Sequence, residues 1–197
     1  MKTRLGAIAL SFMVILMSQT AFAANYDIDL DHSTVGFKIK HLLSNVRGTF
    51  DDFSGSFVYE PGKPETWKVE AVIQSKSINT NVEGRDKHLR GPDFFDVEKY
   101  PEILFKSTNV SLVDEQHAKI EGILTMHGVE KTVTLDVEIH GVAADPWGNV
   151  RSAFTATTTL NRKDFGIIYN QTLESGNLLL GENVDLTIEI EGLQKEA

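Results

Sequence analysis

Apolar and polar residues alternate along most of the chain beyond residue 24, and this period of two is its dominant pattern. Long stretches in which every second side chain is apolar or small lie at residues 35–40, 133–140, 154–160 and 184–191. Shorter stretches of the same kind lie at 53–59, 69–73, 103–105 and 120–126. Such alternation is typical of antiparallel strands with one buried and one solvent-facing side. The pattern therefore predicts an all-β domain of about eight or nine strands.

Turns and one short helix complete the predicted order of elements. The pair His127-Gly128 separates two alternating stretches and predicts a β-hairpin. The Asp-Pro-Trp-Gly-Asn run at 145–149 predicts the next turn along the chain. A helix is predicted only over about 81–89, between the strand that ends near Ile73 and the strand near Ile103.

One-sided strands in this number fit either a two-sheet sandwich or a closed barrel. We expect a barrel, because none of the stretches is apolar on both faces and eight strands enclose room for side chains or one small ligand. The inward positions combine bulky Phe37 and Phe57 with small Gly55, Ala71 and Ala156. This mixture fits a ligand cavity and an ordinary packed core equally well, so periodicity leaves both open.

The first 23 residues have the pattern of a secretory signal peptide. Basic Lys2 and Arg4 precede an apolar run at 5–17, and the triplet Ala21-Phe22-Ala23 follows as a small-x-small cleavage site. The apolar run of 13 residues is shorter than the roughly 20 residues that span a bilayer. We expect cleavage after Ala23 and a single exported domain over 24–197, with an uncleaved membrane anchor as the alternative.

Composition excludes several classes of function. The 197-residue chain has 19 lysines and arginines against 28 aspartates and glutamates, a formal charge of −9. Without a basic stripe to neutralise phosphates, nucleic acid is an unsuitable partner. The chain has no cysteine, so disulfides, thiol nucleophiles and thiolate-bound metals are excluded.

Motifs for catalysis or for a cofactor are missing from the sequence. The six histidines show no H-x-H or H-E-x-x-H spacing, and no G-x-S-x-G run marks a serine nucleophile. No Rossmann or P-loop glycine pattern is present either. We therefore expect no metal, no cofactor and no enzymatic activity.

A charged segment at 84–90 is the densest group of ionisable residues. It contains Arg85, His88 and Arg90, and Phe94 and Phe95 follow closely. One interpretation is a polar rim that meets the headgroup of a ligand beside an apolar mouth. The alternative is a solvated turn whose arginine and aspartate side chains pair with each other, which contributes little.

Seven short motifs occur in order along nearly the whole chain after residue 23. They are Asp31-His32-Ser33, Val46-Arg47-Gly48-Thr49-Phe50, Gly84-Arg85-Asp86 with His88-Leu89, Phe94-Phe95-Asp96 with Tyr100-Pro101, the Gly-Ile-Leu-Thr-Met-His-Gly-Val run at 122–129, Arg162-Lys163-Asp164-Phe165-Gly166 and Val184-Asp185-Leu186-Thr187-Ile188. Each motif is weak alone, but the ordered combination is specific. In this combination the chain resembles the YceI-like family.

The resemblance implies a lipocalin-like, eight-stranded antiparallel β-barrel with one short helix, located in the bacterial periplasm. It implies a carrier of a long amphiphilic lipid, either a polyisoprenoid or an isoprenoid quinone, held in an apolar channel. Transient membrane contact for lipid loading and a homodimer are further expectations. The competing interpretations are an enzyme that acts on a periplasmic lipid or small molecule, and a partner-binding module for a membrane redox protein.

Alternation and position in the family pattern together give the expected ligand-binding residues. We expect Phe94 and Phe95 to shape the mouth, and Arg85, His88 and Arg90 to serve the headgroup. The expected lining residues are Phe37, Ile39, Phe57, Phe105, Leu135, Val137, Phe154, Leu186 and Ile188.

Overall fold

The computed structural model describes residues 23–172 and 178–195, which form one antiparallel sheet and one α-helix. The predicted signal peptide lies outside the described residues except for Ala23. The strands are β1 (Ala24–Ile28), β2 (Thr34–His41), β3 (Ser44–Phe50), β4 (Phe53–Tyr59), β5 (Lys68–Gln74), β6 (Ile78–Asn79), β7 (Glu102–Leu112), β8 (His117–Met126), β9 (Val129–Ala144), β10 (Val150–Asn161) and β11 (Leu180–Gln194). The helix is α1 (Glu83–Arg90), and four 3-10 helices are η1 (Leu30–His32), η2 (Pro64–Thr66), η3 (Ser75–Ser77) and η4 (Arg162–Phe165).

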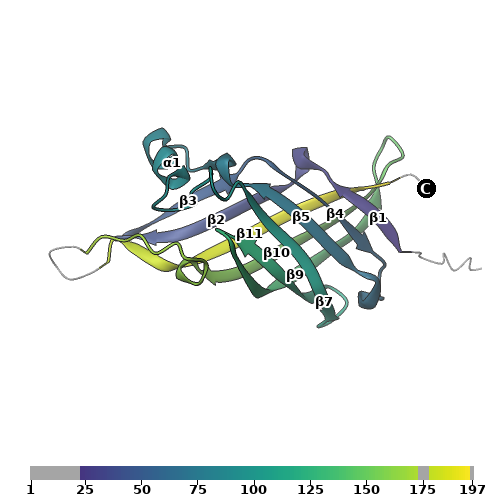
Figure 1. Cartoon of the computed structure of the whole chain (residues 1–197). Helices are drawn as coiled ribbons and strands as arrows, with labels where there is room; N and C mark the ends of the chain where they lie inside the picture. Colours follow the sequence, from purple (N-terminus) through teal and green to yellow (C-terminus); the bar gives the residue numbers. More distant parts are fainter. Residues whose placement is uncertain (1–22, 173–177, 196–197) are drawn as a thin grey trace, which may run out of the picture.

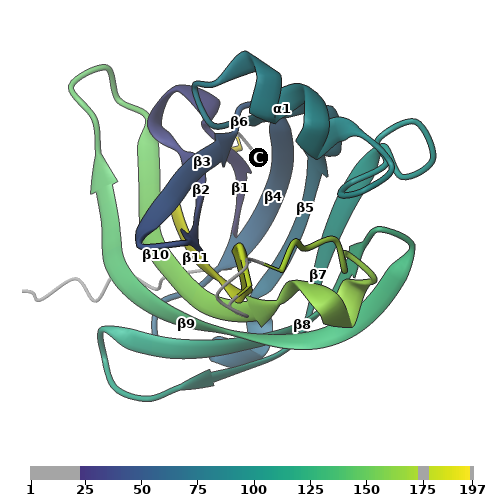
Figure 2. The ribbon, with the colours of Figure 1, turned by 90° about the vertical axis from the view of Figure 1, so that its left-hand side faces the viewer.

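Eight of these strands form a closed ring. Neighbouring strands pair in the order β1-β4-β5-β7-β8-β9-β10-β11, and β11 pairs with β1 to close the barrel. The remaining strands β2, β3 and β6 continue the sheet from the other half of β11. Figure 2 looks along the barrel from the end that carries α1. The predicted eight-stranded antiparallel barrel with one short helix is therefore confirmed.

The predicted turns and the helix occur close to their expected positions. His127 and Gly128 join β8 to β9 with φ angles of 53° and 73°. Two consecutive positive φ angles are those of a type I′ turn, whose twist suits a two-residue hairpin. Residues 145–149 connect β9 to β10, and α1 begins two residues after the predicted start. Within the described ranges, no helix is long and apolar enough to cross a membrane.

Inward side chains form two apolar clusters, one toward each end of the barrel. One cluster includes Tyr26, Phe57, Tyr59 and Trp67, and the Tyr26 and Phe57 rings are stacked with centroids 5.0 Å apart. The other cluster, on the α1 side, includes Phe50, Phe53, Ile78, Leu124 and Phe165. Figure 1 shows α1 at one end of the elongated barrel and the C-terminus at the other. The barrel interior is therefore apolar in both halves, with one hydrophobic cluster in each.

A substitution at Gly122 on β8 tests how closely the inner wall of the barrel is packed. A Cβ at this position would overlap the Phe105 ring and lie 2.7 Å from the carbonyl oxygen of Lys106. We expect Gly122→Ala to lower the free energy of unfolding by about 1–3 kcal/mol, the usual cost of overpacking. The measurement is urea denaturation followed by circular dichroism.

The matched control is Gly84→Ala on α1, where an added Cβ meets no atom within 4 Å. This change should leave stability unchanged or raise it by up to about 1 kcal/mol, because alanine favours helix more than glycine does. Equal losses in the two variants would contradict the close approach of Phe105 to Gly122.

Candidate functional site

An apolar cavity of about 250 Å³ runs through the barrel interior. One ordered water needs only about 10–15 Å³ by this kind of measure, so the space is far larger than a packing defect. Its wall carries residues from both core clusters. All the predicted apolar residues lie on this wall, namely Phe37, Ile39, Phe57, Phe94, Phe95, Phe105, Leu135, Val137, Phe154, Leu186 and Ile188. Their contact with a ligand stays a prediction.

Small inward residues explain why the barrel keeps this space. Ala156 on β10 lies between Val137 on β9 and Ile188 on β11 in the sheet register. Ala71 on β5 lies beside Phe105 on β7 in the same way. Both alanines line the cavity. A larger side chain at either position would occupy part of the cavity. In a packed core, the alternative interpretation, side chains would already fill this space.

Aromatic side chains close the end of the cavity farthest from α1. The Tyr59 ring lies 4.7 Å from Trp67 and 4.9 Å from Phe154, measured between ring centroids. The Trp67 indole Nε1 donates a hydrogen bond of 2.7 Å to the carbonyl oxygen of Glu60. Burial raises the pKa of the Tyr59 hydroxyl, which stays neutral over the physiological range. This end is therefore an uncharged aromatic floor.

Segments outside the strands cover the opposite end. Leu89 on α1, Phe94 and Phe95 after it, and Ile167 after η4 all line the cavity there. The Phe94 ring lies 5.0 Å from both His88 and Tyr169. Because a helix and irregular segments cover this end, whereas packed aromatic rings close the other, we interpret it as the mouth of the cavity.

The three predicted headgroup residues lie near the mouth but not on the cavity wall. Arg85 donates to the Thr80 hydroxyl at 2.7 Å and to the Thr80 carbonyl at 2.9 Å. Arg90 donates to the carbonyl oxygens of Lys76 and Ile78 at 2.7 and 2.8 Å. These arginines fasten α1 to the preceding segment. Their headgroup role stays a prediction.

The contacts within this charged segment also differ from the solvated-turn alternative, in which an arginine and an aspartate side chain pair with each other. The Asp86 carboxylate is buried and accepts hydrogen bonds from the main-chain N–H and the hydroxyl of Thr80. His88 Nε2 lies 2.9 Å from an Asp93 carboxylate oxygen. Since α1 is short and has no side-chain N-cap, these contacts to neighbouring segments hold it in place.

Arg162, at the start of η4, is a cavity residue that the alternation did not reveal. Only 4% of its surface is exposed, and it is the one charged residue on the wall among the described residues. Its guanidinium donates to the carbonyl oxygens of Gly181, Ile167 and Tyr169 at 2.9, 2.7 and 2.7 Å. Burial lowers the pKa of this guanidinium. The motif at 162–166 was the only sequence signal that pointed to it.

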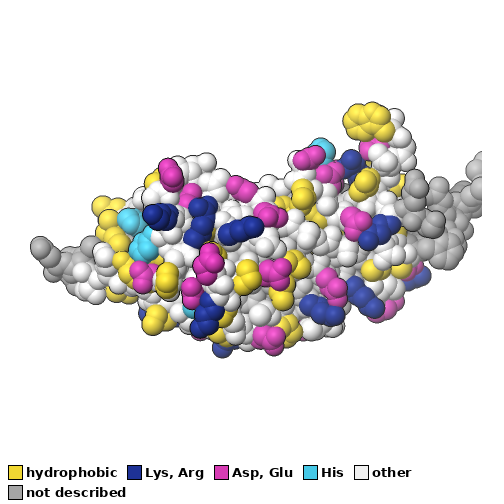
Figure 3. Space-filling model, turned by 45° about the horizontal axis from the view of Figure 1, so that its top comes forward, with side chains coloured by type: hydrophobic (Ala, Val, Ile, Leu, Met, Phe, Trp, Pro, Cys, Tyr) yellow, Lys and Arg dark blue, Asp and Glu magenta, His cyan; other side chains and the backbone are white. Residues whose placement is uncertain are grey.

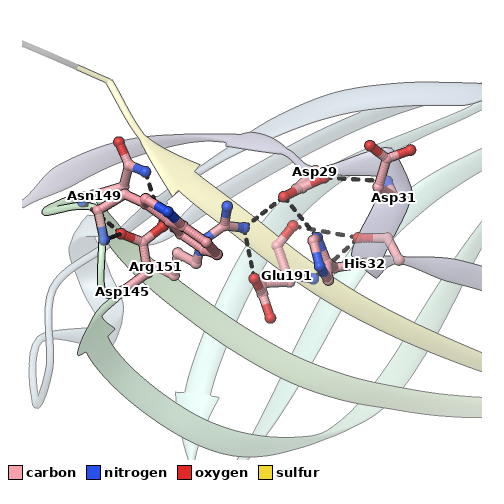
Figure 4. Close-up of polar contacts among 9 residues, drawn as sticks. Asp29, Asp31, His32, Asp145, Asn149, Arg151 and Glu191 are labelled. Carbon is pink, nitrogen blue, oxygen red and sulfur yellow. Dashed lines mark hydrogen bonds and ion pairs between the residues drawn. The ribbon is translucent and has the colours of Figure 1, made fainter.

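A second polar cluster lies at the other end of the barrel, around Arg151 on β10 (Figure 4). Arg151 Nη1 lies 2.5 Å from an Asp29 oxygen and 2.6 Å from a Glu191 oxygen, and its Nε lies 3.1 Å from Asp145. Ligand atoms of Asp29, His32 and Glu191 lie within 4.8 Å of one another. The guanidinium already supplies the positive charge between them, so we interpret the cluster as a structural tie between β10, β11 and the β1–η1 turn.

Three comparisons place the chain among known proteins. A family model described as YceI-like domain matches residues 26–192. A UPF0312 protein of Pseudomonas putida strain GB-1 is 41% identical over 199 residues, which cover 100% of both chains. The crystal structure of a Campylobacter jejuni YCEI protein matches with a TM-score of 0.70 at 30% identity, covering 96% of this chain and 100% of that one.

A more distant structure shares the fold. It is a polyisoprenoid binding domain from Saccharophagus degradans, described as implicated in plant cell wall breakdown. It matches with a TM-score of 0.65 at 16% identity, covering 88% of this chain and 100% of that one. At this identity the likeness shows the barrel architecture.

The Arg151 cluster predicts acid-dependent stability. The Asn149 side chain, together with main-chain N–H groups and Arg151, lowers the pKa of Asp145 to about 2. Arg151 likewise lowers the pKa of Asp29. In the unfolded chain an aspartate titrates near pH ~3.9. The stabilisation is therefore complete above about pH 4 and is lost as the pH falls toward 2.

We expect Asp145→Asn to flatten the fall in unfolding free energy between about pH 4 and 2, because this carboxylate no longer binds a proton on unfolding. Urea denaturation at several pH values measures the slope. Asp164→Asn, an exposed change beyond the opposite end of β10, is the control and should keep the wild-type slope. Parallel curves for wild type and Asp145→Asn would contradict the assigned role.

Proposed function

Because the chain belongs to the YceI-like family, we propose that it carries a long amphiphilic lipid in the barrel cavity and performs no chemistry of its own. The observation that carries this proposal is the continuous apolar wall, which extends from the mouth beneath α1 to the aromatic floor at Trp67. A wall of this composition suits a hydrocarbon tail, which binds without directional partners. The lipid is a polyisoprenoid or an isoprenoid quinone.

Hydrocarbon burial supplies the affinity in this proposal. Removing apolar surface from water contributes about 25 cal/mol per Å². A long tail therefore offsets the cost of association without a hydrogen bond to the tail itself. The ligand named for the Saccharophagus degradans domain supports the isoprenoid class, because its barrel shares this architecture.

Export to the periplasm is the second part of the proposal. It is supported by the basic start, the apolar run and the Ala21-Phe22-Ala23 site, which together favour cleavage after Ala23. A periplasmic carrier moves lipid between membranes or membrane proteins through water. Such a role requires a closed container rather than an open apolar groove.

Apolar side chains around the mouth support transient contact with a membrane. Leu43 in the β2–β3 turn is fully exposed, and Ile168 after η4 is 69% exposed. The exposed residues Leu42, Val82 and Leu178 also lie in segments at this end. Figure 3 shows apolar side chains gathered at the end of the barrel that carries α1. We propose that this rim enters the interfacial region of a bilayer while lipid is loaded or released.

Native mass spectrometry of freshly purified protein tests the carrier proposal, and Ala156→Phe tests the cavity. The new ring occupies the space next to Val137 and Ile188, so the co-purifying lipid should be lost while the delipidated variant stays folded by circular dichroism. Thr157→Phe, one residue along on the exposed face, is the matched control and should retain the lipid. A bare mass for the wild-type protein would favour the enzyme or the partner-binding module.

Unfolding of the delipidated Ala156→Phe variant would mean that this position belongs to a packed core. Ala71→Phe then repeats the test on the opposite side of the cavity. The same spectra report two further expectations. Protein recovered after export should begin at Ala24, and its native mass should be that of a homodimer, which a monomer mass would contradict. A soluble form that begins at Met1 would reject the signal peptide.

Acidic substitutions in the rim test membrane contact. We expect a Leu43→Glu, Ile168→Glu double variant to transfer a fluorescent isoprenoid between vesicles about tenfold more slowly or worse. The reason is that burying two aliphatic side chains contributes several kcal/mol, and each ~1.4 kcal/mol is a factor of ten. Val113→Glu, an exposed apolar position in the β7–β8 turn at the far end, should keep the wild-type rate. Unchanged transfer by the double variant, with lipid bound normally, would remove the rim from the proposal.

A further inference from the structure

Among the described residues, Arg162 is a buried cation without a carboxylate partner. Its three hydrogen bonds all go to main-chain carbonyl oxygens, which are neutral. Its Nη2 has no hydrogen-bond partner among the described residues, although that atom is buried. The nearby Glu182 carboxylate pairs instead with Lys163, at 2.5 Å from its Nζ. No described residue therefore compensates the positive charge of Arg162 by direct contact.

Burying a charged side chain in this way costs free energy unless another group supplies a counter-charge. An arginine stays protonated in proteins, and a buried charge normally requires a paired counter-charge. Buried donors are almost always satisfied, so an unpartnered one indicates an absent partner. Arg162 lies on the cavity wall, and every other described residue of that wall is uncharged. A ligand in the cavity lies next to this side chain and can supply the missing partner.

We propose that Arg162 binds the polar end of the lipid and that this end is an anionic oxygen group, a phosphate or a carboxylate. This inference rests on the proposed function, because it assigns the headgroup site of the same cavity. A guanidinium and an anionic oxygen form a charge-assisted hydrogen bond, the stronger kind. Nη2 supplies the donor, and the ligand supplies the counter-charge.

The position of Arg162 also fixes the direction in which the lipid lies. Ile167 and Tyr169, whose carbonyl oxygens accept from Arg162, belong to the segment that covers the mouth beside Phe94. The aromatic floor around Trp67 lies at the far end. The anionic head therefore lies at the mouth beside η4, and the tail points toward Trp67.

Two probes with one tail and different heads test this assignment. Farnesyl monophosphate and farnesol share an isoprenoid tail, and only the first carries a negative charge. We expect the delipidated wild-type protein to bind farnesyl monophosphate at least about tenfold more tightly than farnesol, measured by displacement of a fluorescent probe at fixed ionic strength. Arg162→Met should bind both with similar affinity, and its affinity for farnesol should stay within about threefold of the wild-type value.

Two matched variants separate a direct contact from general electrostatics and from misfolding. Lys163→Gln removes the adjacent exposed cation and should keep the wild-type preference. Arg162→Lys retains the charge and should restore part of the preference. If Arg162→Met does not fold, a preference that is reduced in Arg162→Lys but unchanged in Lys163→Gln supports the assignment, and an undiminished preference in Arg162→Lys overturns it.

The outcomes distinguish this inference from the proposed function. Binding of both probes with equal affinity by the wild-type protein would overturn the anionic headgroup site and leave the lipid carrier intact. A preference for the phosphate that persists in Arg162→Met would also overturn it. Failure of the wild-type protein to bind either probe would contradict the proposed function itself.

Discussion

Closure of the sheet by β11 is the interaction on which the rest of the structure depends. This one strand pairs with β10 along its length, with β2 through its first part and with β1 at Gly192, Leu193 and Gln194. Without the contact to β1, the apolar faces of the strands would form an open, curved sheet. Closure converts the same faces into the wall of an interior, so the cavity follows from the position of the last strand.

The interior is then shaped by residue size rather than by any special motif. Aromatic rings fill the Trp67 end, whereas Ala71 and Ala156 leave space in the middle. Arg151 and its three carboxylate partners hold the outer face at the end where β1 meets β11. Aromatic packing therefore stabilises both ends, and the two ends differ in their arginines, which pair with carboxylates around Arg151 and donate to main-chain carbonyls around α1 and η4.

Period-two alternation predicted the fold class, the His127-Gly128 hairpin and the apolar wall, because each depends on local side-chain character. It did not predict β3, where Gly48 replaces an apolar inward residue and the Phe37 ring fills the space above it. Strand β1 alternates over Ala24–Ile28 and was missed, whereas β6 has only two residues and cannot show a period. Arg162 was missed as a cavity residue for another reason. Its partners at 167, 169 and 181 are main-chain oxygens, which leave no trace in the sequence.

The fastening of α1 has a consequence for how the barrel responds to heat and denaturant. Its arginines attach it to residues 76–80 by a few side-chain hydrogen bonds, whereas the ring of strands is held by continuous ladders. Segments with fewer cooperative contacts open at lower free energy than the whole domain. Amide hydrogens beneath α1 thus belong to a separate, less protected cooperative unit. The amide hydrogens at α1 can therefore exchange with solvent while the strands of the barrel keep their native structure.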